Sequence, residues 1–363
     1  MRPDDGGDID FVDLQRHVSV LSTGWVSAAG LAWKEDNVLF TAATRGVRAL
    51  YTVTTRGRTS LIAEAPSPLT LLDVSRNHQL LISDEHLRNI MKVVARDSHQ
   101  ERDLSWLDYS AVRDLAPDGQ TILFDESSAG GGAKYSVYIR RVDGSPAIRL
   151  GDGLASSLSP DQRWAICIDS HRRPSPLIIV PTGAGEIRHL ITQGLHHEWG
   201  SWFPDGKTIV FTGVQNGNSR LYVQRIDGGN PRPISPDGAR VLPGSAVSSD
   251  GRWIAALQSR LLTIYPADGG QAQQIRGLTP AERFIGWSSD PRFLFTVRNE
   301  NWHVSIERIT IATGKREHWT DIVFTDLTGL EGRGSFRITP DGNTIAFSFA
   351  RRLTNLHLVD GVR

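Results

Sequence analysis

The sequence predicts an all-β fold, a β-propeller built from four-stranded antiparallel blades. One observation is a hairpin signature that recurs along the 363 residues, most clearly at Pro117-Asp118-Gly119, Pro204-Asp205-Gly206 and Pro340-Asp341-Gly342. A second is the period of that signature, which is close to the length of a propeller blade, about 40–45 residues. A third is that no amphipathic segment of helical period and useful length is found.

The hairpins follow from the chemistry of the turn residues. Proline presets the backbone φ of the first central position, aspartate hydrogen-bonds its own backbone, and glycine accepts the positive φ that follows. Apolar residues flank each turn, as in Ile122-Leu123-Phe124 after the first of these copies. The turn positions, two of them in degenerate copies, are Asp36, Asn77, Asp118, Asp161, Asp205, Asp250, Asp290 and Asp341, separated by 41, 41, 43, 44, 45, 40 and 51 residues.

Eight hairpins predict eight blades, with seven as the alternative if one degenerate unit is an elaboration of its neighbour. The last unit offers strands at 335–339, 344–348 and 355–359 and is one strand short, whereas a surplus strand at 17–22 precedes the first hairpin. Because open sheet edges invite aggregation, we expect this N-terminal strand to close the ring. We therefore expect a single propeller domain over residues 1–363, with 1–7 as a flexible tail.

Composition and charge narrow the possible partners. Lys and Arg together number 40, as do Asp and Glu, so there is no global basic footprint for nucleic acid. No apolar run approaches the roughly 20 residues of a membrane span, and no secretory signal is visible at Met1–Asp10. As written, the chain is expected to be cytoplasmic. The single cysteine, Cys167, lies in a strand-like stretch and is expected to be a small core residue.

The sequence shows no signature of catalysis. It has no His-Arg-Asp loop or Asp-Phe-Gly of a kinase and no Gly-x-Ser-x-Gly elbow of a hydrolase. Gly130-Gly131-Gly132 is interpreted as a flexible loop, because no Gly-Lys-Ser/Thr ending follows. Adjacent residues of a strand point to opposite faces, so His196 and His197 are not expected to share a metal ion. The hairpin aspartates are interpreted as turn residues, and we expect no catalytic residue, metal or cofactor.

A binding face is expected where the loops between the second and third strands of each unit meet the links between units. Polar groups that converge around a central channel make a natural site. The candidate binding residues on these loops are Arg45, Arg48, Glu126, Arg172, Asn216, Arg220, Trp302 and Arg351. Tryptophans beside the hairpins are expected to pack between blades instead: Trp33, Trp164, Trp202, Trp253 and Trp287.

Longer stretches of the chain point to a family. The Pro-Asp-Gly hairpins resemble the WD-like repeats of TolB-type propellers. Further segments resemble the C-terminal propeller of bacterial eukaryotic-like serine/threonine protein kinases, over nearly the whole chain from about Asp5 to Arg363: Gly30-Leu31-Ala32-Trp33, Asp103–Asp108, Gly130–Ala133, Asp143–Ala147 and Pro181–Gly185. The resemblance implies a sensor propeller without assigned catalytic residues. The kinase and membrane span of such proteins are absent from this sequence.

Two functions stay open at this point. The resemblance implies a non-catalytic sensor or binding propeller for a protein or small-molecule ligand, with no nucleic acid as partner. This propeller would be extracytoplasmic if it is the detached sensor part of a membrane kinase. The alternative is a propeller enzyme, similar to a lactonase, lyase or glycosidase, with its site in the channel. Such enzymes gather His, Asp and Glu around the channel, and this sequence offers few of them at equivalent strand positions.

Overall fold

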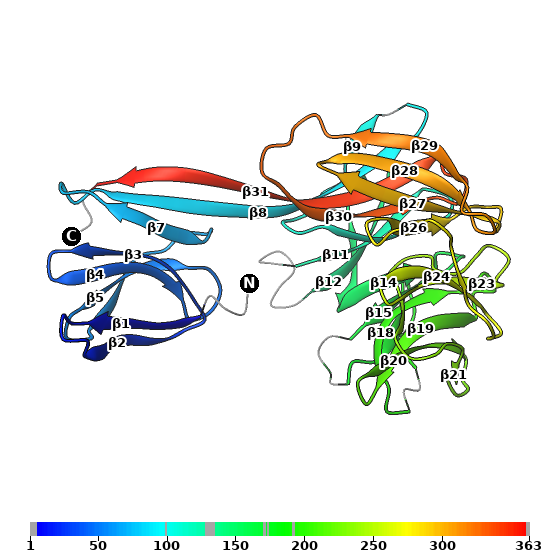
Figure 1. The fold of residues 1–363 in the computed structure, drawn as a ribbon, viewed down its shortest axis with the longest axis horizontal. Helices are drawn as coiled ribbons and strands as arrows, with labels where there is room; N and C mark the ends of the chain where they lie inside the picture. Colours follow the sequence, from blue (N-terminus) through cyan, green and yellow to red (C-terminus); the bar gives the residue numbers. More distant parts are fainter. Residues whose placement is uncertain are drawn as a thin grey trace. The chain divides into compact units, whose positions relative to one another are not determined.

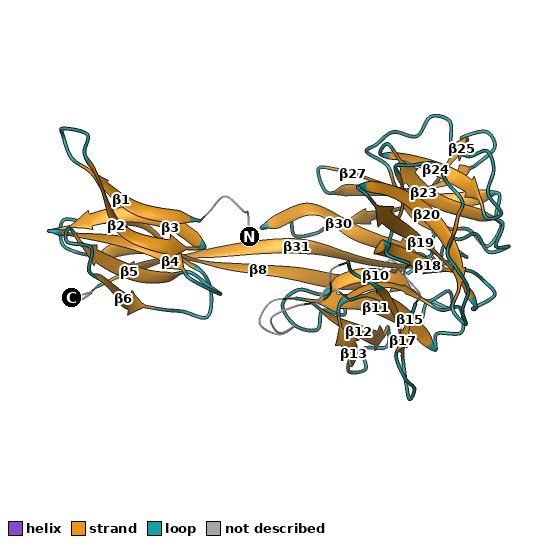
Figure 2. Ribbon diagram, turned by 90° about the horizontal axis from the view of Figure 1, so that it is seen from below, coloured by secondary structure: helices purple, strands orange, loops and turns teal. Residues whose placement is uncertain are grey.

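A computed structural model describes residues 6–98, 100–127, 135–169, 172, 174–190 and 193–360. Its regular structure consists of strands alone, and no helix occurs among these residues (Figure 2). The all-β prediction is therefore confirmed. Nothing in the described part is a helix long and apolar enough to cross a membrane. The Gly130–Gly132 loop and residues 1–5 of the expected tail lie outside the described residues, whereas Gly7 already begins the first strand.

The chain divides into two compact units, which are described separately. Unit 1 comprises Met1–Leu87 and Arg351–Arg363, and unit 2 comprises Arg88–Ala350. The boundary falls inside two strands of 16 residues each, β8 (Leu80–Ala95) and β31 (Thr344–Val359), which are neighbours in one sheet (Figure 1). The expected organisation as one propeller domain over 1–363 stays a prediction.

Unit 1 contains three groups of strands. β1 (Gly7–Val12) pairs with β2 (Val18–Trp25), and the first half of β8 lies between β7 (Leu69–Val74) and the second half of β31. A four-stranded antiparallel sheet contains β3 (Ser27–Lys34), β4 (Asn37–Ala43), β5 (Ala49–Thr54) and β6 (Thr59–Ala63). β3 packs beside β7, and the leucines Leu39, Leu50 and Leu71 fill the core between these sheets.

Unit 2 contains five antiparallel sheets of four strands that are consecutive in the chain, and a sixth that is part of a five-stranded sheet shared with unit 1. The first sheet contains β10 (Ala111–Leu115), β11 (Thr121–Glu126), β12 (Ser136–Arg141) and β13 (Ile148–Asp152). The second contains β14 (Leu154–Leu158), β15 (Trp164–Ile168), β16 (Leu177–Pro181) and β17 (Arg188–His189). The third contains β18 (His196–Trp202), β19 (Thr208–Gln215), β20 (Asn218–Arg225) and β21 (Arg232–Pro233). The fourth contains β22 (Ala239–Val241), β23 (Trp253–Gln258), β24 (Leu261–Pro266) and β25 (Gln273–Gln274). The fifth contains β26 (Arg283–Trp287), β27 (Phe293–Glu300), β28 (His303–Thr310) and β29 (Arg316–Val323). The sixth joins both ends of the unit, in the order β30 (Leu330–Ile338), the first half of β31, the second half of β8 and β9 (Glu101–Asp103).

Hydrogen bonds connect each of these sheets to the next, and the sixth to the first. Leu158 N donates to Asp114 Oδ2 (2.8 Å) between the first and second sheets, and Gly200 N donates to Ser156 Oγ (2.8 Å) between the second and third. Ala246 N donates to Ser201 Oγ (2.9 Å) between the third and fourth, and Trp287 Nε1 donates to Ala246 O (2.8 Å) between the fourth and fifth. Ser289 N donates to Pro340 O (2.7 Å) between the fifth and sixth, and Ser335 Oγ donates to Val112 O (2.8 Å) between the sixth and first. Most of the side chains involved are buried, where an unmade hydrogen bond is costly. The first strands of neighbouring sheets are therefore held in fixed positions.

All eight predicted hairpins connect neighbouring strands, so this part of the prediction is confirmed. The aspartates act as turn residues, as expected. The side chain accepts a hydrogen bond from the backbone N–H two residues later at Asp118 (2.9 Å), Asp205 (2.8 Å), Asp250 (3.1 Å) and Asp341 (3.0 Å). Cys167 is fully buried in the core between the first two sheets of unit 2, which confirms its expected role.

The prediction that the N-terminal strand at residues 17–22 closes the ring was wrong. Residues 17–22 lie almost entirely in β2, which pairs with β1, and the strand beside β31 is β8. The last unit was also expected to break between 348 and 355, whereas β31 runs through this stretch without interruption. Neither β8 nor β31 contains glycine or proline, the residues that most often end a strand. The number of eight blades is not confirmed by this order of sheets.

We expect Phe347→Ala to destabilise the chain by about 3–5 kcal/mol. Phe347 is fully buried on β31 and stacks on Phe336 at a ring distance of 5.7 Å. Urea unfolding followed by tryptophan fluorescence measures the change. Leu358→Ala is the control on the same strand, because this leucine is 63% exposed and its loss should change the free energy by less than about 0.5 kcal/mol. Equal effects of the two variants would contradict the burial of Phe347 on β31.

Candidate ligand-binding channel

All six sheets of unit 2 contribute to one cavity of about 200 Å³, which we call the turn-side cavity. It lies at the end of the sheets where the first strand turns into the second. Its lining comprises Asp114, Leu115, Pro117, Leu158, Pro160, Trp202, Pro204, Ser245, Val247, Ser248, Ser249, Ile285, Gly286, Trp287, Ser288, Arg337, Ile338 and Pro340. Four of these are the prolines of hairpin turns. The turn residues that define the repeat therefore also form the wall of the cavity.

Asp114 is the acidic residue of this cavity, and it is only 2% exposed. Its carboxylate accepts hydrogen bonds from the backbone N–H of Leu115 (2.9 Å) and of Leu158 (2.8 Å). Burial raises the pKa of Asp114 to about 6, against the opposing effects of these hydrogen bonds and of the Arg337 charge. The carboxyl group therefore changes its charge close to neutral pH.

Arg337 lines the same cavity and is held from three sides. It donates from Nε to Arg113 O (2.6 Å), from Nη1 to Phe336 O (2.5 Å) and from Nη2 to Pro243 O (2.7 Å). Burial lowers its pKa to about 10, and the charges of Arg113 and Arg283 act in the same direction. Gly244 makes this position possible, since a Cβ there would lie 2.4 Å from Arg337 Nε.

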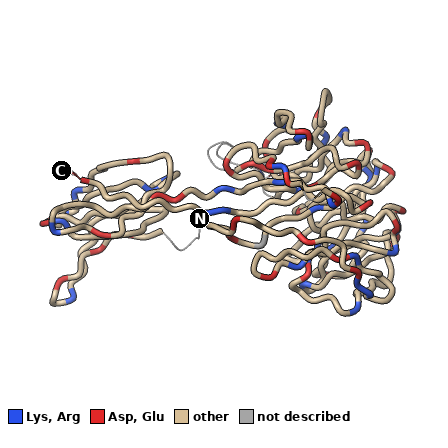
Figure 3. Tube along the Cα trace, turned by 90° about the horizontal axis from the view of Figure 1, so that it is seen from above, with Lys and Arg blue, Asp and Glu red and all other residues tan. Residues whose placement is uncertain are grey.

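A second cavity of about 800 Å³ also contains Arg337, together with Arg113, Arg260 and Arg283, and we call it the arginine cavity. Positive and negative charges are interspersed over the rest of unit 2 (Figure 3), so four arginines around one cavity stand out. Arg283 donates to Gly334 O at 2.7 Å. Arg113 pairs with Asp125 at 2.5 Å and lies over the ring of Trp199.

Arg260 is the most accessible cation of the arginine cavity. It is exposed in the turn between β23 and β24, and no ion pair involves it within the described ranges. The acidic residue of this cavity, Glu282, is buried and already bonded to Arg316 and to Thr279 N. The cavity therefore keeps an excess of positive charge.

A third cavity adjoins the arginine cavity through Leu242 and Leu257, and it contains His196 and His197. The Nδ1 atom of His197 accepts a hydrogen bond from Leu177 N at 2.9 Å, and burial lowers the pKa of His197 to about 4. The imidazole is therefore neutral near pH 7. His196 Nδ1 accepts from Ser175 N at 3.0 Å. Over the residues that the structure describes, no group of three or more His, Cys, Asp or Glu is placed to hold a metal ion.

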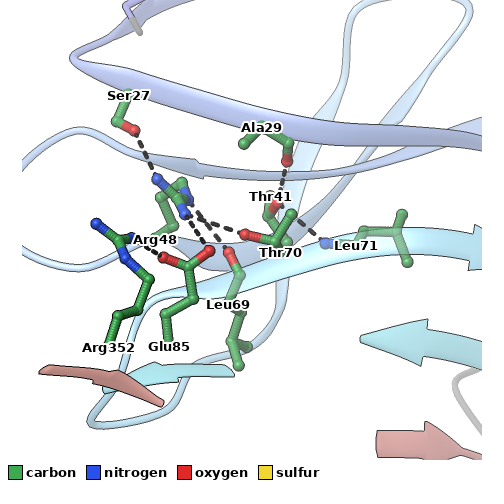
Figure 4. A network of polar contacts seen from close by, with 9 residues as sticks. All are labelled: Ser27, Ala29, Thr41, Arg48, Leu69, Thr70, Leu71, Glu85 and Arg352. Carbon is green, nitrogen blue, oxygen red and sulfur yellow. Dashed lines mark hydrogen bonds and ion pairs between the residues drawn. The ribbon is translucent and has the colours of Figure 1, made fainter. Parts of the chain in front are cut away.

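The three predicted binding residues of unit 1 do not share one environment. Arg45 is exposed in the turn after β4, and Arg351 is half-buried on β31. Arg48 belongs to the polar network of Figure 4, where it donates to Ser27 Oγ (3.3 Å), Leu69 O (3.3 Å) and Thr70 Oγ1 (3.0 Å). Its other partner is Glu85, which also pairs with Arg352 at 2.6 Å. These contacts connect β3, β7, β8 and β31 within unit 1.

The five predicted binding residues of unit 2 are also separate from the cavities. Glu126 is fully buried and accepts hydrogen bonds from the backbone of Leu107 and Tyr109. The others are placed as follows: Arg172 pairs with Asp169, Asn216 is exposed in the turn after β19, Arg220 pairs with Asp237, and Trp302 packs on Phe324. None of the eight predicted residues lines the turn-side, arginine or histidine-containing cavity, and their binding role stays a prediction.

The arginines of the cavity were missed by the sequence analysis, although a signal was present. Three residues before the turn proline or its equivalent, the six hairpins of unit 2 carry Asp114, Ser157, Ser201, Ala246, Gly286 and Arg337. Four of these residues are small, and the two charged ones, Asp114 and Arg337, both line the turn-side cavity. One arginine of the cavity nevertheless lies on the type of loop that was expected to bind, because Arg260 lies between the second and third strands of its sheet.

Comparison with known proteins shows the fold. No family model matches the chain. A curated relative, the uncharacterized protein Atu1656 of Agrobacterium fabrum, is 29% identical over 152 residues, which are 40% of this chain and about half (49%) of that protein's length. A solved structure assigned as TolB from Agrobacterium tumefaciens has a TM-score of 0.54 at 19% identity and covers 74% of this chain and 99% of that chain. TolB from Acinetobacter baumannii has a TM-score of 0.47 at 13% identity, over 92% and 83% of the two chains.

The chain therefore has a TolB-like β-propeller fold. At these identities the likeness establishes the fold and not the function. The part of the prediction that named TolB-type propellers is confirmed at this level. The resemblance to the sensor propeller of kinases is not shown by these matches.

We expect Asp114→Asn to flatten the pH dependence of stability between about pH 4 and pH 7. A carboxyl whose pKa is raised by folding contributes stability below its unfolded pKa of 3.8 and loses it as the pH rises through about 6. The cost of the substitution should therefore be about 2–3 kcal/mol smaller at pH 7 than at pH 4. Urea unfolding of both proteins at several pH values measures this difference. A cost that is the same at every pH would contradict the raised pKa.

Proposed function

We propose that this chain is a non-catalytic binding propeller whose arginine cavity holds an anionic ligand. The observation that carries the proposal is the grouping of four arginines around one cavity of about 800 Å³. Guanidinium groups offer paired donors that match carboxylates and phosphates. Arg113 has Asp125 as an acidic neighbour, and Arg337 has Asp114. The charge of Arg260, which forms no ion pair within the described ranges, would be balanced by the ligand.

The proposal includes the form of the ring. We propose that the six sheets of unit 2 are the blades of one closed propeller, rather than the eight expected from the hairpins. The hydrogen bond from Ser335 to Val112, between the sixth sheet and the first, supports closure. The cavity with contributions from all six sheets supports a common axis.

The acidic side chains of the two cavities favour a binding role over catalysis. The Asp114 carboxylate accepts two backbone N–H groups, and Glu282 accepts from Arg316 and Thr279. Oxygens committed to such donors hold structure in place and are poorly available for proton transfer to a substrate. A sensor role beside a kinase, inside or outside the cytoplasm, is the wider setting suggested by the sequence resemblance.

One observation favours the alternative of a propeller enzyme with a channel site. Asp114 has a pKa of about 6 and lines a cavity, which are features of a general base. The Asp114→Asn variant separates the two functions. A binding protein should keep its affinity for the anion to within a few-fold, whereas an enzyme should lose turnover of that ligand. Product analysis by mass spectrometry after incubation with each bound anion measures turnover.

We expect Arg260→Gln to weaken anion binding by about 10–100-fold, the value of one charge-assisted hydrogen bond. Isothermal titration with citrate, inorganic phosphate and a glutamate-rich peptide identifies an anion that binds, and titration of the variant measures the loss. Binding should also weaken as salt is raised, since the cavity is open to solvent at Arg260.

Arg252→Gln is the matched control, because Arg252 is exposed in the same sheet but does not line the arginine cavity. It should change the affinity by less than about twofold. If no anion binds the native chain at millimolar concentration, or if both variants weaken binding equally, the arginine cavity is not the site.

A further inference from the structure

The turn-side cavity has the size and walls of a small-molecule site. Its volume of about 200 Å³ exceeds the roughly 150 Å³ of a protein cavity known to bind benzene. Most of its lining is apolar, with the indoles of Trp202 and Trp287 on the walls and the turn prolines at the end. These surfaces suit a flat ring, because indoles offer stacking or edge contacts without losing much conformational freedom.

The cavity is kept open by rigid groups. Trp287 is fixed by the hydrogen bond from its Nε1 to Ala246 O at 2.8 Å. Proline fixes its own φ, so the turns at the wall do not collapse inward easily. Gly286 faces Ile338 so closely that a Cβ would lie 3.0 Å from the backbone oxygen of that residue. The sheets therefore already pack tightly beside the cavity, and the space that remains is a fixed part of the fold.

The polar side of the cavity determines the charge of the ligand. Arg337 donates three of its five N–H groups to backbone carbonyls, so two are left for other acceptors. The charges of Arg113 and Arg283 also act on Arg337, and Asp114 opposes them. The Asp114 oxygens already accept backbone N–H groups, so the remaining N–H groups of Arg337 favour a negatively charged end over an ammonium group.

We infer that the turn-side cavity is a second ligand site, separate from the arginine cavity, for a small aromatic carboxylate. The ring lies among Trp202, Trp287 and the turn prolines, and the carboxylate is directed to Arg337. The inference does not depend on the proposed function, because no part of it requires an anion in the arginine cavity.

Ser288 and Ser289 provide a matched pair of variants. Ser288 is buried and lines the cavity, whereas its neighbour Ser289 is exposed and does not line it. Ser288→Leu places a larger apolar side chain in the space of the ligand, and Ser289→Leu makes the same change outside it. Val247→Phe narrows the cavity from the fourth sheet and replaces Ser288→Leu if that variant does not fold.

The experiment is a titration of the full chain with phenylacetate, followed by the fluorescence of its tryptophans. Saturable binding is expected in the native chain and in Ser289→Leu, with roughly tenfold or greater weakening in Ser288→Leu, since the added side chain occupies the site. Phenethylamine, which has the same ring and the opposite charge, should bind more weakly than phenylacetate. Thermal unfolding of each variant confirms that it is folded before titration.

The arms of the experiment separate this site from the arginine cavity. Arg260→Gln should leave phenylacetate binding unchanged, and Ser288→Leu should leave the binding of citrate or phosphate unchanged. The inference is overturned if phenylacetate does not bind the native chain, if Ser288→Leu binds it as tightly as Ser289→Leu does, or if the amine binds better. Loss of phenylacetate binding in Arg260→Gln would also overturn it, because both ligands would then share one cavity.

Discussion

The contact between β30 and β10 determines most of what unit 2 can do. Here Arg337 donates to the backbone oxygen of Arg113, and Ser335 donates to Val112 O at 2.8 Å. These bonds connect β30 to β10, and the two strands lie more than 200 residues apart in the chain. A contact of such sequence separation costs chain entropy to form. It therefore has to be supported by buried hydrogen bonds and by the apolar core of the sixth sheet.

The same contact separates two cavities of different character. On one side the turn prolines and tryptophans form an apolar wall, and the other side is lined by Arg260, Arg283 and Arg113. Arg337 belongs to both cavities, and its carbonyl partners fix its guanidinium between them. The negative charge of Asp114 stabilises the charge of Arg337, whereas burial raises the pKa of Asp114 and lowers the pKa of Arg337. Architecture and electrostatics thus depend on one pair of residues.

Much of the fold was predictable from local chemistry. Turn residues at Asp118, Asp205 and Asp341 hydrogen-bond within the next two positions, so their roles follow from nearby sequence alone. The strand that lies beside β31 did not follow, because the choice between residues 17–22 and β8 depends on long-range pairing. Both candidates alternate like strands, and no turn signal distinguishes the one that meets β31.

The candidate site was less predictable than the fold. Sequence reasoning selected polar residues on loops, and several of these already have partners within the chain. Glu126 accepts hydrogen bonds from backbone N–H groups, and Arg220 forms an ion pair with Asp237. The arginines of the cavity instead come largely from first strands, where apolar or small residues were expected. Comparing equivalent positions before each turn would have shown Asp114 and Arg337 as exceptions, since a charge next to a propeller axis needs a partner or a ligand.

The most direct test of this account is the variant Arg337→Lys, measured for both stability and ligand binding. Lysine keeps the charge but lacks the planar fork that reaches three carbonyl groups. If Arg337 both connects the first and last sheets and completes the cavities, the free energy of unfolding should fall by about 2–4 kcal/mol, and anion binding should weaken in parallel. A variant that binds anions as the native chain does, with unchanged stability, would contradict the account.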